Sequence, residues 1–222
     1  MSAVWAAASA PVVRRLGLAP YLPTLASMQA FTAARDADTR DEIWLLQHPP
    51  TYTYGVAGRA EHLPREDAGI ALVKVDRGGQ ITYHGPGQIV VYTLLDLRRM
   101  GIGVKTLVQR LEQAVLDVLT DHGIRGERRA GAPGVYVRGA KLAALGLRIR
   151  NGCSYHGLSV NVAMDLAPFD AIDPCGYHGL AVAQVRDLGV AESPERIGER
   201  LLHHLLRNLA EATASAQPTS RA

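Results

Sequence analysis

The stretch ITYHGPGQIVVYTLLDL, residues 81–97, constrains the fold more than any other part of this sequence. It contains two apolar, β-rich runs that are interrupted at Gly85-Pro86-Gly87. Proline removes a backbone donor from a strand ladder and glycine permits a tight turn. We therefore expect two strands joined by a turn, in the middle of a sheet.

Helical and strand-like patterns alternate along the rest of the chain. Apolar residues at helical spacing predict helices over 22–35, 104–119 and 194–210. Short apolar runs predict strands near residues 42–48, 70–75, 134–137, 141–149 and 157–162, and we expect HPPTYTYG, residues 48–55, to be a turn. This order predicts one α/β domain over residues 1–210, followed by a disordered tail over 211–222.

Bulk properties narrow the class of protein. With 222 residues, 47% of them hydrophobic, the chain can bury a substantial single core. The net charge of +3 favours acidic partners but is too small to argue for nucleic acid. No apolar run reaches membrane-spanning length, and two cysteines indicate a reducing compartment, so we expect a cytoplasmic protein. The lack of acidic residues before Asp36 leaves an organellar transit peptide as an alternative.

The segment DRGGQITYHGPGQ, residues 76–88, has the composition of a ligand-binding loop. Its glycines let backbone N–H groups approach a ligand, Arg77 can address a carbonyl or phosphate, and Gln80, Thr82 and His84 supply orienting hydrogen bonds. The spacing matches no nucleotide-binding fingerprint. A glycine-rich sheet corner is the structural alternative.

Cys175 is the better candidate of the two thiols for a nucleophile. Pro174 and Gly176 favour a bend that would present its sulfur, whereas Cys153 lies in an Asn-Gly-Cys-Ser turn with nothing adjacent to activate it. A thiol is mostly protonated at neutral pH and needs a cationic neighbour or a base. Lys141, in an otherwise small and apolar strand, is the best cationic candidate.

The residues alone leave other roles for the cysteines and histidines possible. Cys175 could pair with His84, His156 or His178 as in thiol hydrolases, or form a disulfide with Cys153. The adjacent His203 and His204 point about 100° apart on a helix and suit packing better than a shared metal. No zinc-like spacing occurs, so we expect neither a metal nor a cofactor.

Four motifs together resemble the lipoyl(octanoyl) transferase family: RGGQITYHGPGQ (77–88), KLAALGLRIR (141–150), YHGLSVNV (155–162) and FDAIDPCG (169–176). DEIWLLQHPPTYTYG (41–55) extends the resemblance to roughly residues 18–190. Tyr136, Ser159 and Ala183 are departures from common residues of the family. The resemblance implies a fold like the catalytic domain of biotin and lipoate protein ligases, with a mixed β-sheet flanked by helices.

The resemblance also implies an activity and its residues. Octanoyl would pass from octanoyl-acyl carrier protein, through a thioester on Cys175 activated by Lys141, to a lysine of lipoyl domains in 2-oxoacid dehydrogenases or of the glycine cleavage H protein. We expect a monomer that needs no ATP. The implied substrate-binding residues are Arg77, Gly78, Gly79, Gln80, Ile81, Thr82, Tyr83, His84, Ala144, Leu145, Gly146, Gly157, Leu158 and Ser159.

Two rival functions remain on sequence grounds. An ATP-dependent lipoate or biotin ligase would share the fold but needs no cysteine nucleophile. A silent module that binds carrier domains would need neither Lys141 nor Cys175.

Overall fold

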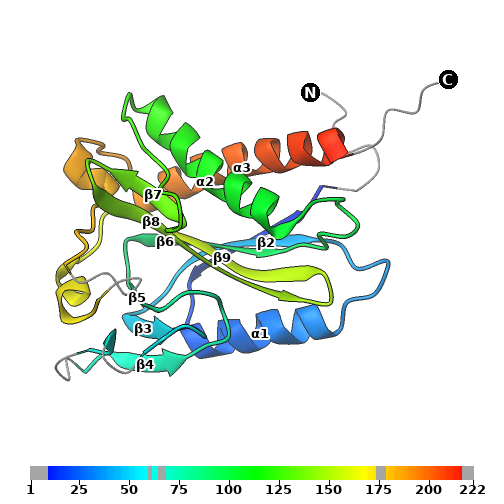
Figure 1. The fold of residues 1–222 in the computed structure, drawn as a ribbon, viewed down its shortest axis with the longest axis horizontal. Helices are drawn as coiled ribbons and strands as arrows, with labels where there is room; N and C mark the ends of the chain where they lie inside the picture. The colour runs from blue at the N-terminus through cyan, green and yellow to red at the C-terminus, as the bar shows by residue number, and fades with distance from the viewer. Residues whose placement is uncertain (1–9, 60–61, 65–68, 174–178, 217–222) are drawn as a thin grey trace.

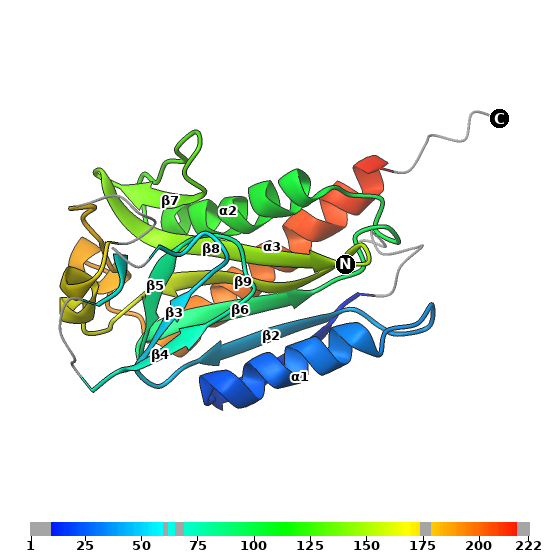
Figure 2. The ribbon, with the colours of Figure 1, turned by 60° about the horizontal axis from the view of Figure 1, so that its bottom comes forward.

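The computed structural model describes residues 10–59, 62–64, 69–173 and 179–216. A mixed sheet forms the middle layer, with helices α2 and α3 on one face and α1 with a smaller sheet on the other (Figure 1). The turned view in Figure 2 shows the same separation of α1 from the α2–α3 pair. The expected α/β fold, a mixed sheet flanked by helices, is confirmed.

The large sheet has six strands in the order β1-β2-β6-β9-β8-β7. Only β1 and β2 pair in parallel, and the other neighbours are antiparallel. Its strands are β1 (Val12–Leu18), β2 (Glu42–Gln47), β6 (Gln88–Leu94), β7 (Gly134–Val137), β8 (Ala140–Arg150) and β9 (Cys153–Asn161). The expected hairpin of 134–137 with 141–149 is therefore present as β7 and β8.

Strand β1 was missed from sequence. Residues 12–18 lie in the segment that suggested a possible transit peptide, but they pair along β2 from Val12 opposite Glu42 to Leu18 opposite Gln47. The exposed arginines of VVRRLGL obscure the strand, because alternation on an edge strand leaves few buried positions. This part of the segment belongs to the sheet.

A three-stranded sheet, ordered β4-β3-β5, corrects the prediction of a turn at residues 48–55. Its strands are β3 (Thr51–Tyr54), β4 (Ala71–Lys74) and β5 (Ile81–His84). Half of the turn expected at 48–55, residues 51–54, is strand β3, which pairs with both neighbours and whose Thr and Tyr residues favour strands.

The interruption at Gly85-Pro86-Gly87 separates two sheets. Strand β6 is central in the large sheet, as expected, but β5 is an edge strand of the small one. Gly87 has φ +87°, and a Cβ there would lie 2.1 Å from the carbonyl oxygen of Ala163. Only glycine fits this crossing point.

Three α-helices complete the described fold: α1 (Tyr21–Ala33), α2 (Val104–Asp121) and α3 (Pro194–Ala216). The expectation of a tail from residue 211 is corrected, because α3 continues to Ala216, where Ala212 and Thr213 are still buried. Residues 217–222 lie outside the described part of the chain. None of the described helices is both long and apolar enough to cross a membrane.

The main core lies between the large sheet and the α2–α3 pair. Leu107, Leu111 and Val115 of α2 are at most 1% exposed there, and Leu205 and Leu209 of α3 are fully buried. The opposite face of the sheet has a smaller apolar cluster with α1, and it leaves room for a cavity.

Candidate active site

A cavity lies between the glycine-rich loop and the inner strands of the large sheet. It encloses about 480 Å³ of empty space, including the open solvent at its mouth. Its walls are formed by Tyr21, Arg77, Gly79, Gln80, Ile81, Thr82, His84, Val90, Tyr92, Ala144, Leu145, Gly146, His156, Gly157, Leu158 and Ser159.

The structure brings together most of the residues that were expected to bind substrate. Of the fourteen, all line this cavity except Gly78 and Tyr83. Gly78 lines a neighbouring groove, and its N–H donates to the carbonyl of Leu147 at 2.8 Å. Tyr83 lies on the other face of β5 and packs against Tyr52 and Phe169, at ring distances of 5.5 and 5.6 Å.

Four lining residues were absent from the predicted set: Tyr21, Val90, Tyr92 and His156. Val90 and Tyr92 are two residues apart on β6, so strand alternation could have found them once β6 was placed beside β9. Tyr21 comes from α1, far away in the sequence, and no local pattern marks it.

Two glycines allow the cavity to form. Gly146 of β8 pairs with Gly157 of β9. A Cβ on Gly146 would lie 2.9 Å from Cδ of Arg77, and a Cβ on Gly157 would lie 2.0 Å from the carbonyl oxygen of Val91. Glycine at these positions lets the Arg77 loop approach β8 closely and lets β6 approach β9 closely.

Arg77 holds the loop in place. Its Nη2 donates to the carbonyl of Thr53 at 2.8 Å and to Thr53 Oγ1 at 2.9 Å, and Nη1 donates to the carbonyl of Gly78 at 3.0 Å. The side chain is only 8% exposed. These bonds tie the guanidinium to the small sheet, which shows a structural use that the sequence did not indicate.

A chain of buried hydrogen bonds leads away from this arginine. Thr53 Oγ1 lies 3.3 Å from His84 Nε2, and His84 Nδ1 lies 2.7 Å from Gln88 Oε1. The Gln88 amide donates to Asn161 Oδ1 at 2.9 Å, and Asn161 Nδ2 donates to the carbonyl of Ala183 at 3.0 Å. The cavity is thus linked to the segment around Ala183.

His84 is neutral within this chain. Because Gln88 Nε2 donates to Asn161 and to the Tyr83 carbonyl, its Oε1 is left to accept from His84 Nδ1–H. Burial, with a smaller effect of nearby His48, holds the pKa of His84 well below its ordinary value. The ring suits positioning better than proton transfer.

A second polar group anchors the start of the loop. Asp76 accepts from the Tyr155 hydroxyl and from His156 Nε2, the latter at 3.0 Å. Burial opposes ionisation of Asp76, but these hydrogen bonds bring its pKa below the ordinary value. Burial likewise lowers the pKa of His156 despite the carboxylate, so Nε2–H donates and the imidazole is neutral.

Lys141 lies beside the cavity in a buried setting. It is 5% exposed and lines a smaller cavity that shares Thr82, Ala144 and Ser159 with the larger one. Its Nζ lies 5.5 Å from the centre of the Tyr136 ring, a cation–π distance. The side chain tip fits because Gly134 has no Cβ, which would lie 2.7 Å from Lys141 Cε.

The backbone of Lys141 is bonded to a segment that follows Cys175 in sequence. Its N–H donates to the carbonyl of Ala181 at 2.8 Å, and its carbonyl accepts from Ala183 at 2.9 Å. On the other side of residues 174–178, Phe169 and Ile172 are buried against the small sheet. Cys175 and His178 themselves lie outside the described residues.

Cys153 and His204 are buried within the fold, whereas His203 is exposed. Cys153 is a free, buried thiol, and burial raises its pKa, which disfavours the reactive thiolate. His204 Nε2 lies 2.7 Å from Asp121 Oδ2, between α3 and α2. Within the described residues, no three His, Cys, Asp or Glu side chains are grouped so as to hold a metal.

Solved structures share this fold at low sequence identity. A lipoate-protein ligase A bound with ATP superposes with a TM-score of 0.74 at 16% identity, over 93% of each chain. A biotin protein ligase from Aquifex aeolicus in complex with biotin and ATP gives 0.59 at 12% identity, over 88% of this chain and 70% of that one. The model of the lipoyl protein ligase A/B catalytic domain matches residues 20–206. Fold and family model thus define the class, a catalytic domain of the lipoyl protein ligase A/B type.

Sequence relatives narrow that class. An octanoyltransferase of Azoarcus sp. (strain BH72) is 62% identical over 92% of this chain and 90% of its own length. An octanoyltransferase of Dechloromonas aromatica (strain RCB) is 61% identical over 90% of this chain and 97% of its own. The chain therefore belongs to the octanoyltransferase family, and the predictions of family and of an acyltransferase are confirmed.

Proposed function

We propose that this protein transfers an octanoyl group from octanoyl-acyl carrier protein, through a thioester on Cys175, to a lysine of lipoyl domains. The acceptors would be 2-oxoacid dehydrogenase subunits and the glycine cleavage H protein. The observation that carries the proposal is the cavity, because twelve of the fourteen expected substrate residues line it and buried Lys141 lies beside it. The cytoplasm, which keeps thiols reduced, suits this chemistry.

The acyl chain would lie in the larger cavity. Val90, Ile81 and Leu158 give this cavity apolar walls. Burial of a methylene contributes about 0.8 kcal/mol, so an octanoyl tail would gain roughly 5 kcal/mol. Thr82, Ala144 and Ser159 connect this tail site to the smaller cavity of Lys141, where the carbonyl would react.

Two transfers at the carbonyl complete the reaction. The Cys175 thiolate attacks the carrier thioester, a new carbon–sulfur bond forms, and the carrier leaves as a thiolate that takes up a proton. The acceptor amine then attacks, a carbon–nitrogen bond forms, and the bond to Cys175 breaks. Thioester exchange is nearly isoenergetic and amide formation is downhill, so no ATP is required.

Lys141 is assigned the activation of the thiol. A cationic neighbour stabilises the thiolate and lowers the pKa of Cys175. In its neutral form the same amine could accept a proton from the incoming lysine ammonium. The bonds of Lys141 to Ala181 and Ala183 support this role, since they fix it against the segment that follows the cysteine.

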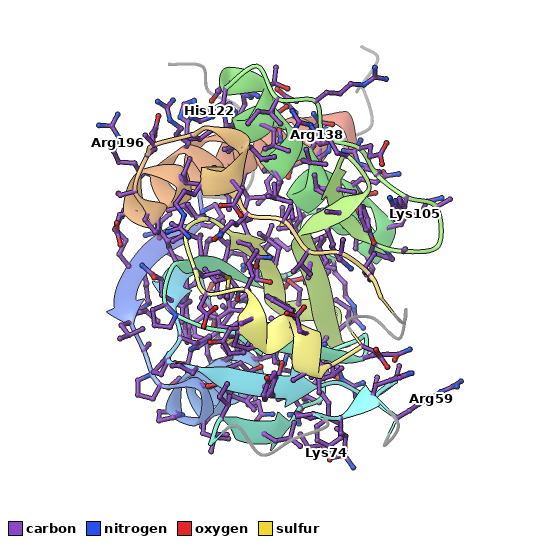
Figure 3. The ribbon with its side chains drawn as sticks, turned by 90° about the vertical axis from the view of Figure 1, so that its left-hand side faces the viewer. Arg59, Lys74, Lys105, His122, Arg138 and Arg196 are labelled. Carbon is purple, nitrogen blue, oxygen red and sulfur yellow. The ribbon has the colours of Figure 1, made fainter. Side chains whose placement is uncertain are left out.

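Exposed basic side chains at one end of the molecule suit acidic partners. Figure 3 looks onto this end and shows Arg59, Lys105 and Arg138 projecting outward from separate parts of the chain. All three side chains are exposed. Exposed basic side chains such as these favour encounter with acidic carrier and lipoyl domains.

Intact mass spectrometry after mixing with octanoyl-acyl carrier protein tests the intermediate. The wild type and Cys153→Ser should gain one octanoyl group that hydroxylamine removes, and Cys175→Ser should gain none that is hydroxylamine-labile as a thioester. An absent adduct on the wild type would rule out the mechanism. Transfer that requires octanoate and ATP would instead favour a ligase.

Lys141→Ala tests the activator. We expect acyl transfer to fall about 10²–10⁴-fold and alkylation of Cys175 to move to higher pH, because the thiolate loses its cationic neighbour. The measurement is the iodoacetamide rate against pH, in a Cys153→Ser background. An unchanged profile in a folded variant would remove Lys141 from this role.

A further inference from the structure

The larger cavity is lined by two residues with unpaired polar atoms, among the residues that the structure describes. His156 lines the cavity and is only 1% exposed. Among the residues that the structure describes, its Nδ1 meets no hydrogen-bond partner, and the same is true of Gln80 Oε1. A buried acceptor without a donor is unfavourable, and apolar groups packed against it keep it unpaired.

Strand register places His156 at one end of the cavity. Ala144 pairs with Ser159 at the end that adjoins Lys141, and Gly146 pairs with Gly157 two residues further on. From Ser159 to His156 the distance along β9 is roughly 10 Å, at the usual rise per residue. An extended eight-carbon acyl chain that starts at the Lys141 end is of comparable length.

Bulky side chains close this end beyond the two glycines. The stem of Arg77 covers Gly146, with its Cδ 2.9 Å from the ideal Cβ position. The Tyr92 ring stands edge-on to His156 at 6.0 Å, and the Tyr92 hydroxyl lies 2.7 Å from His48 Nε2. Arg77, Tyr92 and His156 thus form a wall at this end of the cavity, and their contacts hold it in place.

His156 is held in the wall by an unusual backbone and a carboxylate. Its φ is +60°, which is uncommon for any residue other than glycine. Asp76 holds Nε2, so the ring cannot turn to satisfy Nδ1 without losing that bond. The arrangement keeps an unpaired acceptor on the His156 ring at this end of the cavity.

We propose that this wall, with His156 at its centre, sets the length of the acyl chain that the enzyme transfers. An octanoyl chain ends before the wall. A decanoyl chain would press methylenes against Nδ1 of His156 and would also need the space that Arg77 and Tyr92 occupy. The inference rests on the proposed function, since it assumes that the acyl carbonyl lies at the Lys141 end.

Two substitutions at His156 remove the wall while respecting the backbone. His156→Gly is compatible with φ +60° and opens the end of the cavity. His156→Asn also tolerates this conformation and has a shorter side chain, so it serves if the glycine variant fails to fold. Tyr155→Phe is the matched control, because it removes the other bond to Asp76 but does not line the cavity.

The test is kcat/KM for hexanoyl-, octanoyl-, decanoyl- and dodecanoyl-acyl carrier protein. We expect the decanoyl-to-octanoyl ratio to rise about tenfold or more in His156→Gly, less in His156→Asn, and to stay at the wild-type value in Tyr155→Phe. An unchanged ratio in whichever His156 variants fold would overturn the wall. If the wild type transfers none of the four chains, the proposed function itself fails.

Discussion

The two faces of the large sheet differ in what they bury. Against α2 and α3 the sheet packs almost only aliphatic side chains. Against α1 and the small sheet it buries the loop arginine, three histidines and several amides and hydroxyls, among them Arg77, His48, His84, His156, Gln88, Asn161 and Thr53. Burial on the first face stabilises the fold. Burial of polar groups on the second face is less favourable, but it preorganises a polar site.

Truncating the aliphatic face should produce the largest loss of stability. Leu111 of α2 is fully buried in the main core and does not line the cavity. Leu111→Ala should lower the free energy of unfolding by about 2–5 kcal/mol through lost burial and a residual cavity. Urea unfolding measures this, and acyl transfer by the folded variant should stay near the wild-type rate.

A lower rate of acyl transfer in folded Leu111→Ala would contradict the distinction between the two faces. It would mean that packing against the helices also affects the geometry of the active site. A loss of stability below 1 kcal/mol would mean that the core collapses around the gap.

Acid should act on the polar face through His48. Its Nδ1 lies 2.7 Å from the Ala19 carbonyl and its Nε2 2.7 Å from the Tyr92 hydroxyl, so the neutral ring donates once and accepts once. Burial lowers its pKa from 6.5 to about 4. The unfolded chain therefore binds a proton at higher pH than the folded one, and stability is lost as pH falls from 6.5 towards 4.

The expected loss from His48 over this window is about 3 kcal/mol. Urea unfolding at several pH values checks it, with His48→Gln as the variant whose curve should be flatter. Glu192, with a pKa lowered to about 2 chiefly by Arg200, loses its contribution only below its ordinary value of 4.5. Stability that does not change until pH 4.5 would count against a histidine origin.

Two buried asparagines offer a matched test of the faces. Asn161 links Gln88 to the Ala183 carbonyl on the polar face, whereas Asn208 of α3 donates to Asp117 Oδ2 at 2.9 Å on the helix side. They are 5% and 3% exposed. Substitution of either by leucine should cost about 1–3 kcal/mol, because polar partners are left unpaired.

Only Asn161→Leu should also lower kcat and shift the alkylation profile of Cys175. The reason is that Ala183 bonds to Lys141, so release of Ala183 disturbs the position of the proposed activator. Equal kinetic effects of the two variants would indicate a general loss of rigidity. In that case the hydrogen-bond chain would have no specific role.

The sequence predicted the features of these two faces that depend on residues close together in the chain. It missed features that depend on which strands pair. Helix periodicity found α2 because Leu107, Leu111 and Val115 recur on one side, and motif order found most of the cavity wall. The contribution of Tyr21 and the placement of β5 and β6 in different sheets were missed, since they depend on which sheet each strand joins. The bonds of Arg77 to Thr53 also depend on that pairing, and local sequence does not encode it.

The smallest effect should come from Arg15 of β1, whose neighbour Arg14 pairs with a different element. Arg15 forms a bidentate pair with Glu199 of α3 at 2.6 and 2.8 Å, with both side chains about half exposed. Arg14 pairs with Glu42 at 2.5 Å, and Glu42 is 5% exposed and also accepts from Trp44 Nε1. Arg15→Ala should cost less than about 1 kcal/mol, since solvent screens an exposed pair.

Arg14→Ala should cost more than Arg15→Ala, because it leaves a largely buried carboxylate without its cation. Urea unfolding of both variants at low and high salt separates the two cases. The Arg15 effect should fade with salt and the Arg14 effect should persist, as burial limits screening. Equal, salt-sensitive losses would show that the polar face protects its charges no better than the surface does.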